Sequence, residues 1–230
     1  MIDRINYNYR KYLGVSINIQ ILFQNHELVV VDKPHGLSVH NNEDPINLLS
    51  ILEKQLKVEK LYPIHRLDKE TSGIQIFALN QAAARKLSDE FQEKTVKKIY
   101  IGILRGQLKE SKGQWNKKLT DKAEGRTNPQ GMSADRVPCE TKFTVIRSSK
   151  FFTYCEFDLI TGRQHQIRKH TALINHSLVG DSRYGDKSYN KKMANLYKTE
   201  RMFLHCLKVE ILGMTFESRV PDEFEHLFKL

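Results

Sequence analysis

A stretch of nine residues, from His65 to Gly73, brings together side chains of several reactive types. It supplies an imidazole, a guanidinium, a carboxylate and two hydroxyl groups, on His65, Arg66, Asp68, Thr71 and Ser72. These are the kinds of groups that carry acid–base and nucleophilic chemistry. Pro63 upstream and the alternating apolar run 74–79 downstream predict a loop that leads into a strand. A loop of this composition on a scaffold strand suggests a functional site, although a solvated turn held by Asp68 and Thr71 would use the same residues.

The segment from Thr161 to His170 is the second concentration of polar side chains, and it carries two arginines together with histidines and a lysine. We expect a helix over residues 162–175, entered through Gly162. The free amides at such a helix start could hold a phosphate, with the arginines adding bidentate contacts. A basic, solvent-facing helix surface is the alternative. His165 and His170 lie about 140° apart around a helix, so the pattern predicts no metal site.

The composition restricts the classes of function. The 230-residue chain has a formal net charge of +10 and a pI of about 9.4, which favours a polyanionic partner, above all nucleic acid. We see no signal peptide, membrane span, basic amphipathic helix or lipidation motif. The three cysteines are far apart, which argues against a disulfide framework or a zinc ribbon and favours a reducing cytoplasm. Glycine-rich phosphate loops, nucleotide fingerprints and Gly-x-Ser-x-Gly elbows are missing from the sequence.

The hydrophobic pattern predicts an α+β protein with a mixed, mostly antiparallel sheet flanked by helices. Strands are expected at 21–23, 28–31, 74–79, 98–104, 139–145, 151–159 and 203–211. Helices are expected to begin at Asp44-Pro45, with aspartate as the cap, and at Asn80, and to cover 162–175 and 221–228. Residues 106–136 are interpreted as two edge strands plus a mobile loop, and 188–198 as a polar insertion. Residues 1–20 are expected to be an N-terminal arm, and 21–230 the folded domain.

Several stretches occur together in an order that identifies a family. The sequence His65-Arg66-Leu67-Asp68-x-x-Thr71-Ser72-Gly73 resembles the signature of the RluA-type RNA pseudouridine synthases. Further stretches resemble the other motifs of that family, in its order: Val31 to His40, Lys98-x-Tyr100, Thr161 to His170, Val179 to Gly185, and Leu204-His205. The resemblance covers the chain from about Ile21 onward. Asn175 and Ser177 depart from the usual glycine and proline around His176, and Lys69-Glu70 replaces the commoner Arg-Asp pair.

The resemblance implies the isomerisation of uridine within RNA to pseudouridine, without a cofactor or a metal. Asp68 matches the catalytic aspartate, which attacks C1′ or assists formation of a glycal. Tyr100 matches the tyrosine that stacks on the base, and Arg168 the arginine that pairs with the aspartate. Arg66 matches the residue that enters the RNA stack when the target base is flipped out.

Other cations are expected to lie near the same site. His65, Lys33, Lys98 and Arg163 are predicted to contact RNA, although a solvated cation is an equally good interpretation for the two lysines and Arg163. We expect a monomer that acts on tRNA or ribosomal RNA and does not bind a membrane. The residues before Ile21 are too few for the small ribosomal-protein-like RNA-binding domain of many relatives. A non-catalytic RNA-binding protein and a hydrolase of the uridine glycosidic bond remain alternatives.

Overall fold

The computed structural model describes residues 18–40 and 46–228, and its residues cluster into two units. The first unit ends at Ser88, and the second begins at Asp89. The predicted arm over residues 1–20 lies largely outside the described residues. Its last part is ordered by Gln55, whose side-chain amide exchanges two hydrogen bonds of 2.9 Å with the backbone of Ile19.

The first unit is built on antiparallel strands that follow the alternation of the sequence. Its elements are β1 (Gln20–Gln24), β2 (Leu28–Lys33), α2 (Leu48–Leu56), β3 (Tyr62–Pro63), β4 (Ser72–Ala78) and the greater part of α3 (Gln81–Gln92). β2 pairs with β1 on one side and with β4 on the other, and β3 adds to β4. Asn25 closes the turn between β1 and β2 by accepting hydrogen bonds from the amides of Glu27 and Leu28. The predicted strands and turn of this unit are therefore confirmed.

Helix α2 begins later than the pattern predicted. Asp44 and Pro45 lie outside the described residues, and the residue that caps α2 is Asn47. The Asn47 side chain accepts from the amide of Ser50, and the Ser50 hydroxyl accepts from the amide of Asn47, which forms a capping box. Because this reciprocal pair satisfies two orphan amides, it fixes the helix start without the aspartate.

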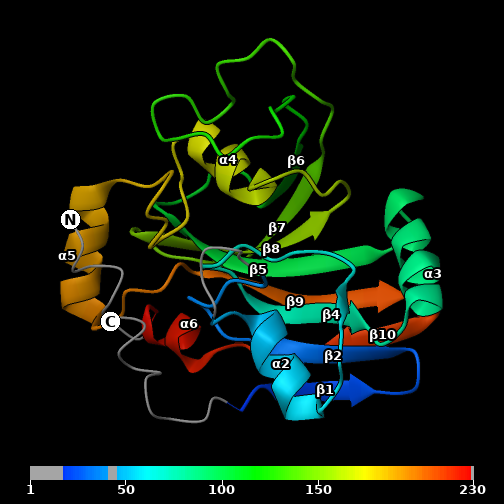
Figure 1. Cartoon of the computed structure of the whole chain (residues 1–230). Helices are drawn as coiled ribbons and strands as arrows, with labels where there is room; N and C mark the ends of the chain where they lie inside the picture. The colour runs from blue at the N-terminus through cyan, green and yellow to red at the C-terminus, as the bar shows by residue number, and fades with distance from the viewer. Residues whose placement is uncertain (1–17, 41–45, 229–230) are drawn as a thin grey trace. The chain divides into compact units, whose positions relative to one another are not determined.

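The second unit contains a longer antiparallel sheet (Figure 1). Its elements are β5 (Lys97–Arg105), β6 (Lys112–Trp115), β7 (Thr141–Ser148), β8 (Phe152–Leu159), α4 (Gln166–Leu173), α5 (Lys187–Tyr197), β9 (Leu204–Ile211), β10 (Met214–Glu217) and α6 (Asp222–His226). The strand order is β9-β5-β8-β7-β6, and β10 pairs with β9. An apolar cluster of this unit joins Ile101 and Ile103 of β5 and Tyr154 of β8 to Phe224 of α6. Alternation along β5 therefore turns Tyr100 and Gly102 toward the opposite face of the sheet.

Two predictions for the second unit need correction here. Residues 106–136 contain one strand, β6, and an isolated bridge between Leu119 and Val137, instead of two edge strands. The polar insertion 188–198 is a helix, α5, capped by Asp186, whose side chain accepts from the amide of Tyr189. Its apolar face, Tyr189, Met193 and Tyr197, recurs at helical spacing but is only partly buried, and it was overlooked among polar and charged neighbours.

The α+β class predicted from the sequence is confirmed, and all the strand pairings within each unit that involve described residues are antiparallel. No helix in residues 18–40 or 46–228 combines the length and the apolar character needed to cross a bilayer.

Candidate active site

The loop that carries Asp68 is fastened to β4 by a buried glutamine. The Gln75 side chain is fully buried, its oxygen accepts from the Leu67 amide at 3.1 Å, and its nitrogen donates to the His65 carbonyl at 2.7 Å. The Asp68 carbonyl accepts from the Thr71 amide at 3.1 Å, which closes the turn before the strand. The half-buried Asp68 side chain thus sits on a backbone that is fixed on both sides.

Lys33 takes a structural position in this loop. Its side chain is fully buried, and its ammonium donates to the carbonyls of Pro34, Leu37 and Lys69 at 2.9, 2.6 and 3.2 Å. The amide of Gly36 also donates to the Lys69 carbonyl, at 2.8 Å. The ammonium therefore joins two loops of the first unit. It offers no exposed charge to an RNA phosphate, contrary to the contact predicted from the sequence.

The two residues before Leu67 differ in their surroundings. The His65 ring accepts a hydrogen bond on Nε2 from the Ile76 amide at 3.1 Å, so this nitrogen carries no proton and the ring helps to anchor the loop to β4. Arg66 is exposed. Exposure is what a residue that inserts into RNA would need, and it is also what a solvated cation shows.

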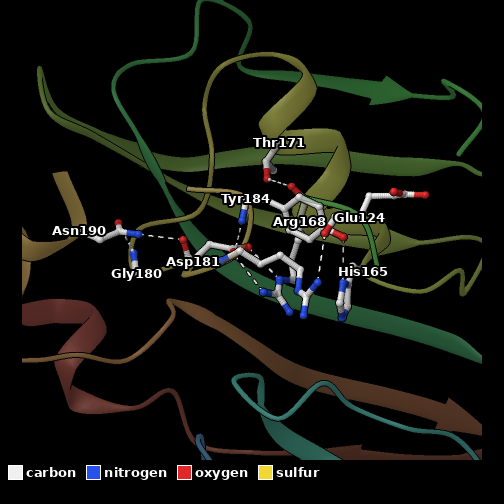
Figure 2. A network of polar contacts seen from close by, with 9 residues as sticks. Glu124, His165, Arg168, Thr171, Gly180, Asp181, Tyr184 and Asn190 are labelled. Atoms are coloured by element: carbon white, nitrogen blue, oxygen red, sulfur yellow. Dashed lines mark hydrogen bonds and ion pairs between the residues drawn. The ribbon is translucent and has the colours of Figure 1, made fainter. Parts of the chain in front are cut away.

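In the second unit, Arg168 forms a buried ion pair with Asp181 (Figure 2). The guanidinium Nε and Nη2 donate to the two carboxylate oxygens at 2.8 and 2.9 Å, and the exposed fractions of the two side chains are 2% and 0%. Asp181 also accepts from the amides of Arg183 and Tyr184, both at 2.9 Å. A carboxylate with this many donors is held rigidly, and it fixes the plane of the guanidinium in turn.

Tyr184 completes this network on a second side of Arg168. The guanidinium carbon lies 5.4 Å from the centre of the Tyr184 ring, and the tyrosine hydroxyl lies 3.0 Å from Nδ1 of His165 (Figure 2). The Tyr184 ring therefore helps to orient Arg168, and its hydroxyl helps to hold His165 in the turn before α4. His165 itself adopts a left-handed backbone conformation, with φ of 56°.

Tyr100 lies on β5, in register with Phe157 of β8 and Cys206 of β9, and it is 7% exposed. Lys98 precedes it by two residues and so lies on the same face of the strand. Burial is the main cause that lowers the pKa of the Lys98 ammonium, while Asp158 and Cys206 oppose the shift. A Cβ atom on Gly162 would lie 3.6 Å from Lys98 Nζ, so the lysine reaches the turn before α4.

The helix after this turn starts at Gln166, four residues later than predicted. The Gln166 side-chain oxygen accepts from the Thr161 hydroxyl at 2.7 Å and from the Arg163 amide at 3.1 Å, while its nitrogen donates to the Glu140 carbonyl at 2.9 Å. These bonds hold residues 161–165 as a turn. The amides around Gly162 are therefore not the helix start proposed for a phosphate, and Arg163 lies 3.8 Å from the Asp121 carboxylate in a partly exposed ion pair.

His170 and Lys169 hold the rest of α4 against the segment 117–122 and against β7. The Lys169 ammonium is fully buried and donates to the carbonyls of Thr120 and Lys122 at 2.7 and 2.6 Å. The His170 ring lies 3.1 Å from the Lys117 carbonyl through Nε2 and 3.0 Å from the Thr141 hydroxyl through Nδ1. Burial lowers the pKa of His170 and so favours the neutral ring, while the hydrogen bond to the Lys117 carbonyl opposes the shift.

Sequence reasoning gave no role to three side chains that prove central to these networks: Gln75, Asp181 and Lys169. Gln75 could have been noticed as a polar residue inside the apolar run 74–79, because a polar side chain in a buried strand needs internal partners. Asp181 stood in a matched motif without an assigned function. The eight predicted site residues divide between the units: His65, Arg66, Asp68 and Lys33 belong to the first, and Lys98, Tyr100, Arg163 and Arg168 to the second.

Comparison of the sequence with known protein families identifies the class to which the fold belongs. The sequence profile of the family described as RNA pseudouridylate synthase matches residues 27–173, and the chain belongs to this family. The expectation drawn from the motifs is therefore confirmed at the level of the family.

The relatives to which the chain is similar are named as pseudouridine synthases of the ribosomal large subunit or of tRNA. It is 35% identical over 200 residues to the ribosomal large subunit pseudouridine synthase C of Pasteurella multocida, a match that covers 83% of this chain and 59% of that protein. It is 30% identical over 208 residues to the tRNA pseudouridine synthase C of Haemophilus ducreyi, covering 82% and 83%. The chain thus spans less than two thirds of the length of the first of these relatives.

Among solved structures, human RNA pseudouridylate synthase domain containing 1 superposes with a TM-score of 0.74 at 26% identity, over 92% of this chain and 86% of that one. Human RNA pseudouridylate synthase domain containing 4 has the same TM-score at 24% identity, and covers 98% and 96%. The predicted pseudouridine synthase fold is confirmed by these similarities.

Proposed function

We propose that this chain isomerises uridine to pseudouridine within structured RNA. The observation that carries the proposal is the match of the family profile to residues 27–173, a range that contains Asp68, Tyr100 and Arg168. The net charge of +10 suits a polyanionic substrate.

The reaction breaks the C1′–N1 bond of the nucleotide, turns the uracil, and joins C5 to C1′. The proton lost from C5 is balanced by one gained at N1, so the product is an isomer and no co-reactant is needed. Asp68 is the carboxylate that attacks C1′ or assists formation of a glycal. Its position on a loop fixed by Gln75 supports this role, since a nucleophile must be held close to the reacting carbon.

Tyr100 and Arg168 are proposed to act on the base and on the carboxylate. A base extruded from a helix costs a few kcal/mol in lost stacking, and an aromatic ring offsets about 1–3 kcal/mol of that cost. The buried pair with Asp181 orients the planar Arg168 group, and a fixed guanidinium can direct a carboxylate better than a mobile lysine can. Arg66 is exposed and is proposed to fill the gap that the flipped nucleotide leaves.

The substrate class is proposed as tRNA or ribosomal RNA, because relatives of similar identity carry names of both kinds. Mapping of pseudouridine in total RNA, with and without this protein, would identify the target. We also propose that the protein works as a cytoplasmic monomer, which light scattering and cell fractionation test.

A single-turnover assay with product analysis separates the proposed function from the two alternatives. The wild-type protein should convert uridine to pseudouridine, whereas a hydrolase would release free uracil and a binding protein would leave the RNA unchanged. Asp68→Asn should abolish product and leave RNA affinity equal or slightly higher, because a negative charge near the phosphates is removed. Glu70→Gln removes a carboxylate from the same loop and serves as the control that should stay active. Substantial product from Asp68→Asn would falsify the assignment of this carboxylate.

A further inference from the structure

A cavity of about 460 Å³ opens on the second unit, beside the network of Arg168, and Tyr184 is the residue that the two share. Its walls come from the end of β5, the residues after α4, the start of α5 and the long segment between β6 and β7: Arg105, Gly106, Arg126, Ala172, Asn175, His176, Ser177, Tyr184 and Asp186. A volume of this size lies in the range of small-ligand sites. None of the residues with a proposed catalytic role lines it.

Arg105 is the first cation of this cavity. Its guanidinium lies 4.5 Å from the centre of the Tyr189 ring, so its plane is set by an aromatic face. Among the described residues it forms no ion pair within 4 Å. A guanidinium whose face is stacked keeps its N–H edges available for a phosphate.

Arg126 is the second cation, and Asp186 is its partner at 2.8 Å. The Asp186 carboxylate also accepts from the Ser188 hydroxyl and the Tyr189 amide, at 2.6 and 2.9 Å, as the cap of α5. Its acceptor capacity is largely engaged by these three donors. Two guanidiniums and one carboxylate leave the cavity with a net positive charge.

Gly106 and His176 are neighbours in the lining of the cavity. The Arg105 carbonyl lies 2.8 Å from Nδ1 of His176, which donates to it. The φ of Gly106 is +77°, a conformation that favours glycine, and a Cβ atom there would lie 3.4 Å from that same nitrogen. The amide of Gly106 donates to the carbonyl of Phe151 at 2.7 Å, and Phe151 is 65% exposed.

We propose that this cavity binds a backbone phosphate of the RNA substrate, outside the target nucleotide, with an adjacent base stacked on Phe151. The two guanidiniums in the lining can hold a phosphate through bidentate contacts. Phe151, whose carbonyl is bonded to the Gly106 amide, offers an exposed ring on which a base can stack. Tyr184 separates the cavity from Arg168, which its ring contacts, so the bound nucleotide would be a close neighbour of the target. The proposal rests on the proposed function for the identity of the RNA as a substrate.

The test is the binding of a fluorescein-labelled 12-nucleotide oligouridine, measured by anisotropy at several salt concentrations. Arg105→Gln with Arg126→Gln should weaken binding roughly tenfold and reduce the salt slope by about 0.7 for each arginine. Arg147→Gln is the matched control for each single variant, because Arg147 pairs with Glu225 on the same unit but does not line the cavity. Equal losses in the control and in the single variants Arg105→Gln and Arg126→Gln would overturn the proposal.

Asp186→Asn supplies a variant with the opposite sign. Asparagine caps a helix as well as aspartate does, so α5 should persist while the negative charge of the cavity is lost. Affinity for the oligouridine should rise about threefold. A fall would mean that the carboxylate contacts the ligand directly, and the phosphate assignment would be wrong.

Two further comparisons separate RNA from a free anion and this site from the enzyme activity. Phe151→Ala should weaken oligouridine binding about tenfold, whereas Ile146→Ala, at another exposed apolar residue, should not. Displacement of the oligouridine by millimolar inorganic phosphate at constant ionic strength would instead indicate a small-anion site. If the wild-type protein makes pseudouridine while the cavity variants bind normally, this inference fails and the proposed function stands. If the wild-type protein makes no product but the cavity variants lose RNA binding, the proposed function fails and this inference stands.

Discussion

The ion pair between Asp181 and Arg168 allows a quantitative prediction for Asp181→Asn. Oδ1 of Asp181 accepts from Arg168 Nη2 and from the amides of Arg183 and Tyr184, and Oδ2 accepts from Arg168 Nε. Asparagine in the same pose keeps the three bonds at Oδ1. At the other position it places an N–H donor against Nε–H, so one charge-assisted bond is lost and two donors face each other.

The cost follows from the burial of both partners. Removing the charge of one partner from a buried pair costs about 3 kcal/mol, because the guanidinium loses the charge that compensates it. For a chain of this length, each kcal/mol lowers Tm by about 2–4 °C, so the expected decrease is about 6–12 °C. The same change frees the guanidinium to rotate, and single-turnover pseudouridine formation should fall even below the new Tm.

Thermal unfolding followed by circular dichroism at pH 7.5 measures the first effect. Asp222→Asn is the matched control, since Asp222 pairs with Arg219 at the same 2.8 Å distance but with side chains that are 72% and 82% exposed. Exposed pairs contribute about 0–1 kcal/mol, so this control should change Tm by only a few degrees. If Asp181→Asn is no more destabilising than Asp222→Asn, the buried pair does not hold Arg168 as described.

Three further predictions concern other residues. Burial lowers the pKa of His205 to about 3 from 6.5, so the unfolded chain binds the extra proton first and stability falls as the pH drops below 6.5. The loss of stability should reach about 2 kcal/mol at pH 5. Urea unfolding of His205→Gln should therefore show a shallower pH dependence than that of the wild-type protein. Tyr100→Phe should retain RNA binding and slow the single-turnover rate, whereas Tyr100→Ala should lose both; full activity of the phenylalanine variant would leave stacking as the sole role of the ring. Arg66→Ala should impair a structured RNA more than a short unstructured strand, and equal losses would show that Arg66 does not insert into the stack.

Local patterns predicted the strands well, because alternation and turn residues act over a few positions. β4 and β5 were both expected, and each is buried along most of its length. The start of α4 was misplaced because it depends on a tertiary contact: the Gln166 side chain bonds the Glu140 carbonyl and keeps the preceding residues in a turn. Helix α5 packs through Tyr189, Met193 and Tyr197, which recur at helical spacing but are only partly buried. This narrow apolar face was overlooked among the polar and charged residues around it.

The residue types of the site were predictable, but their partners were not. Asp68 and Arg168 stand in motifs that can be read along the chain. The pairing of Arg168 with Asp181 joins residues 13 positions apart, and its bidentate geometry cannot be derived from spacing. Lys33 was expected on the surface because lysines usually are, and only the fold reveals the three carbonyls that surround its ammonium.

The two buried lysines have a consequence for chemical labelling. An amine enclosed by backbone carbonyls cannot attack an acylating reagent until the loop around it opens, so its labelling rate reports local opening. The acylation rates of Lys33 in the first unit and Lys169 in the second would therefore report two local openings in one reaction. Mass spectrometry of the peptide that carries each lysine would measure each rate. Their rates with and without RNA would tell which of the two anchored loops moves when the substrate binds.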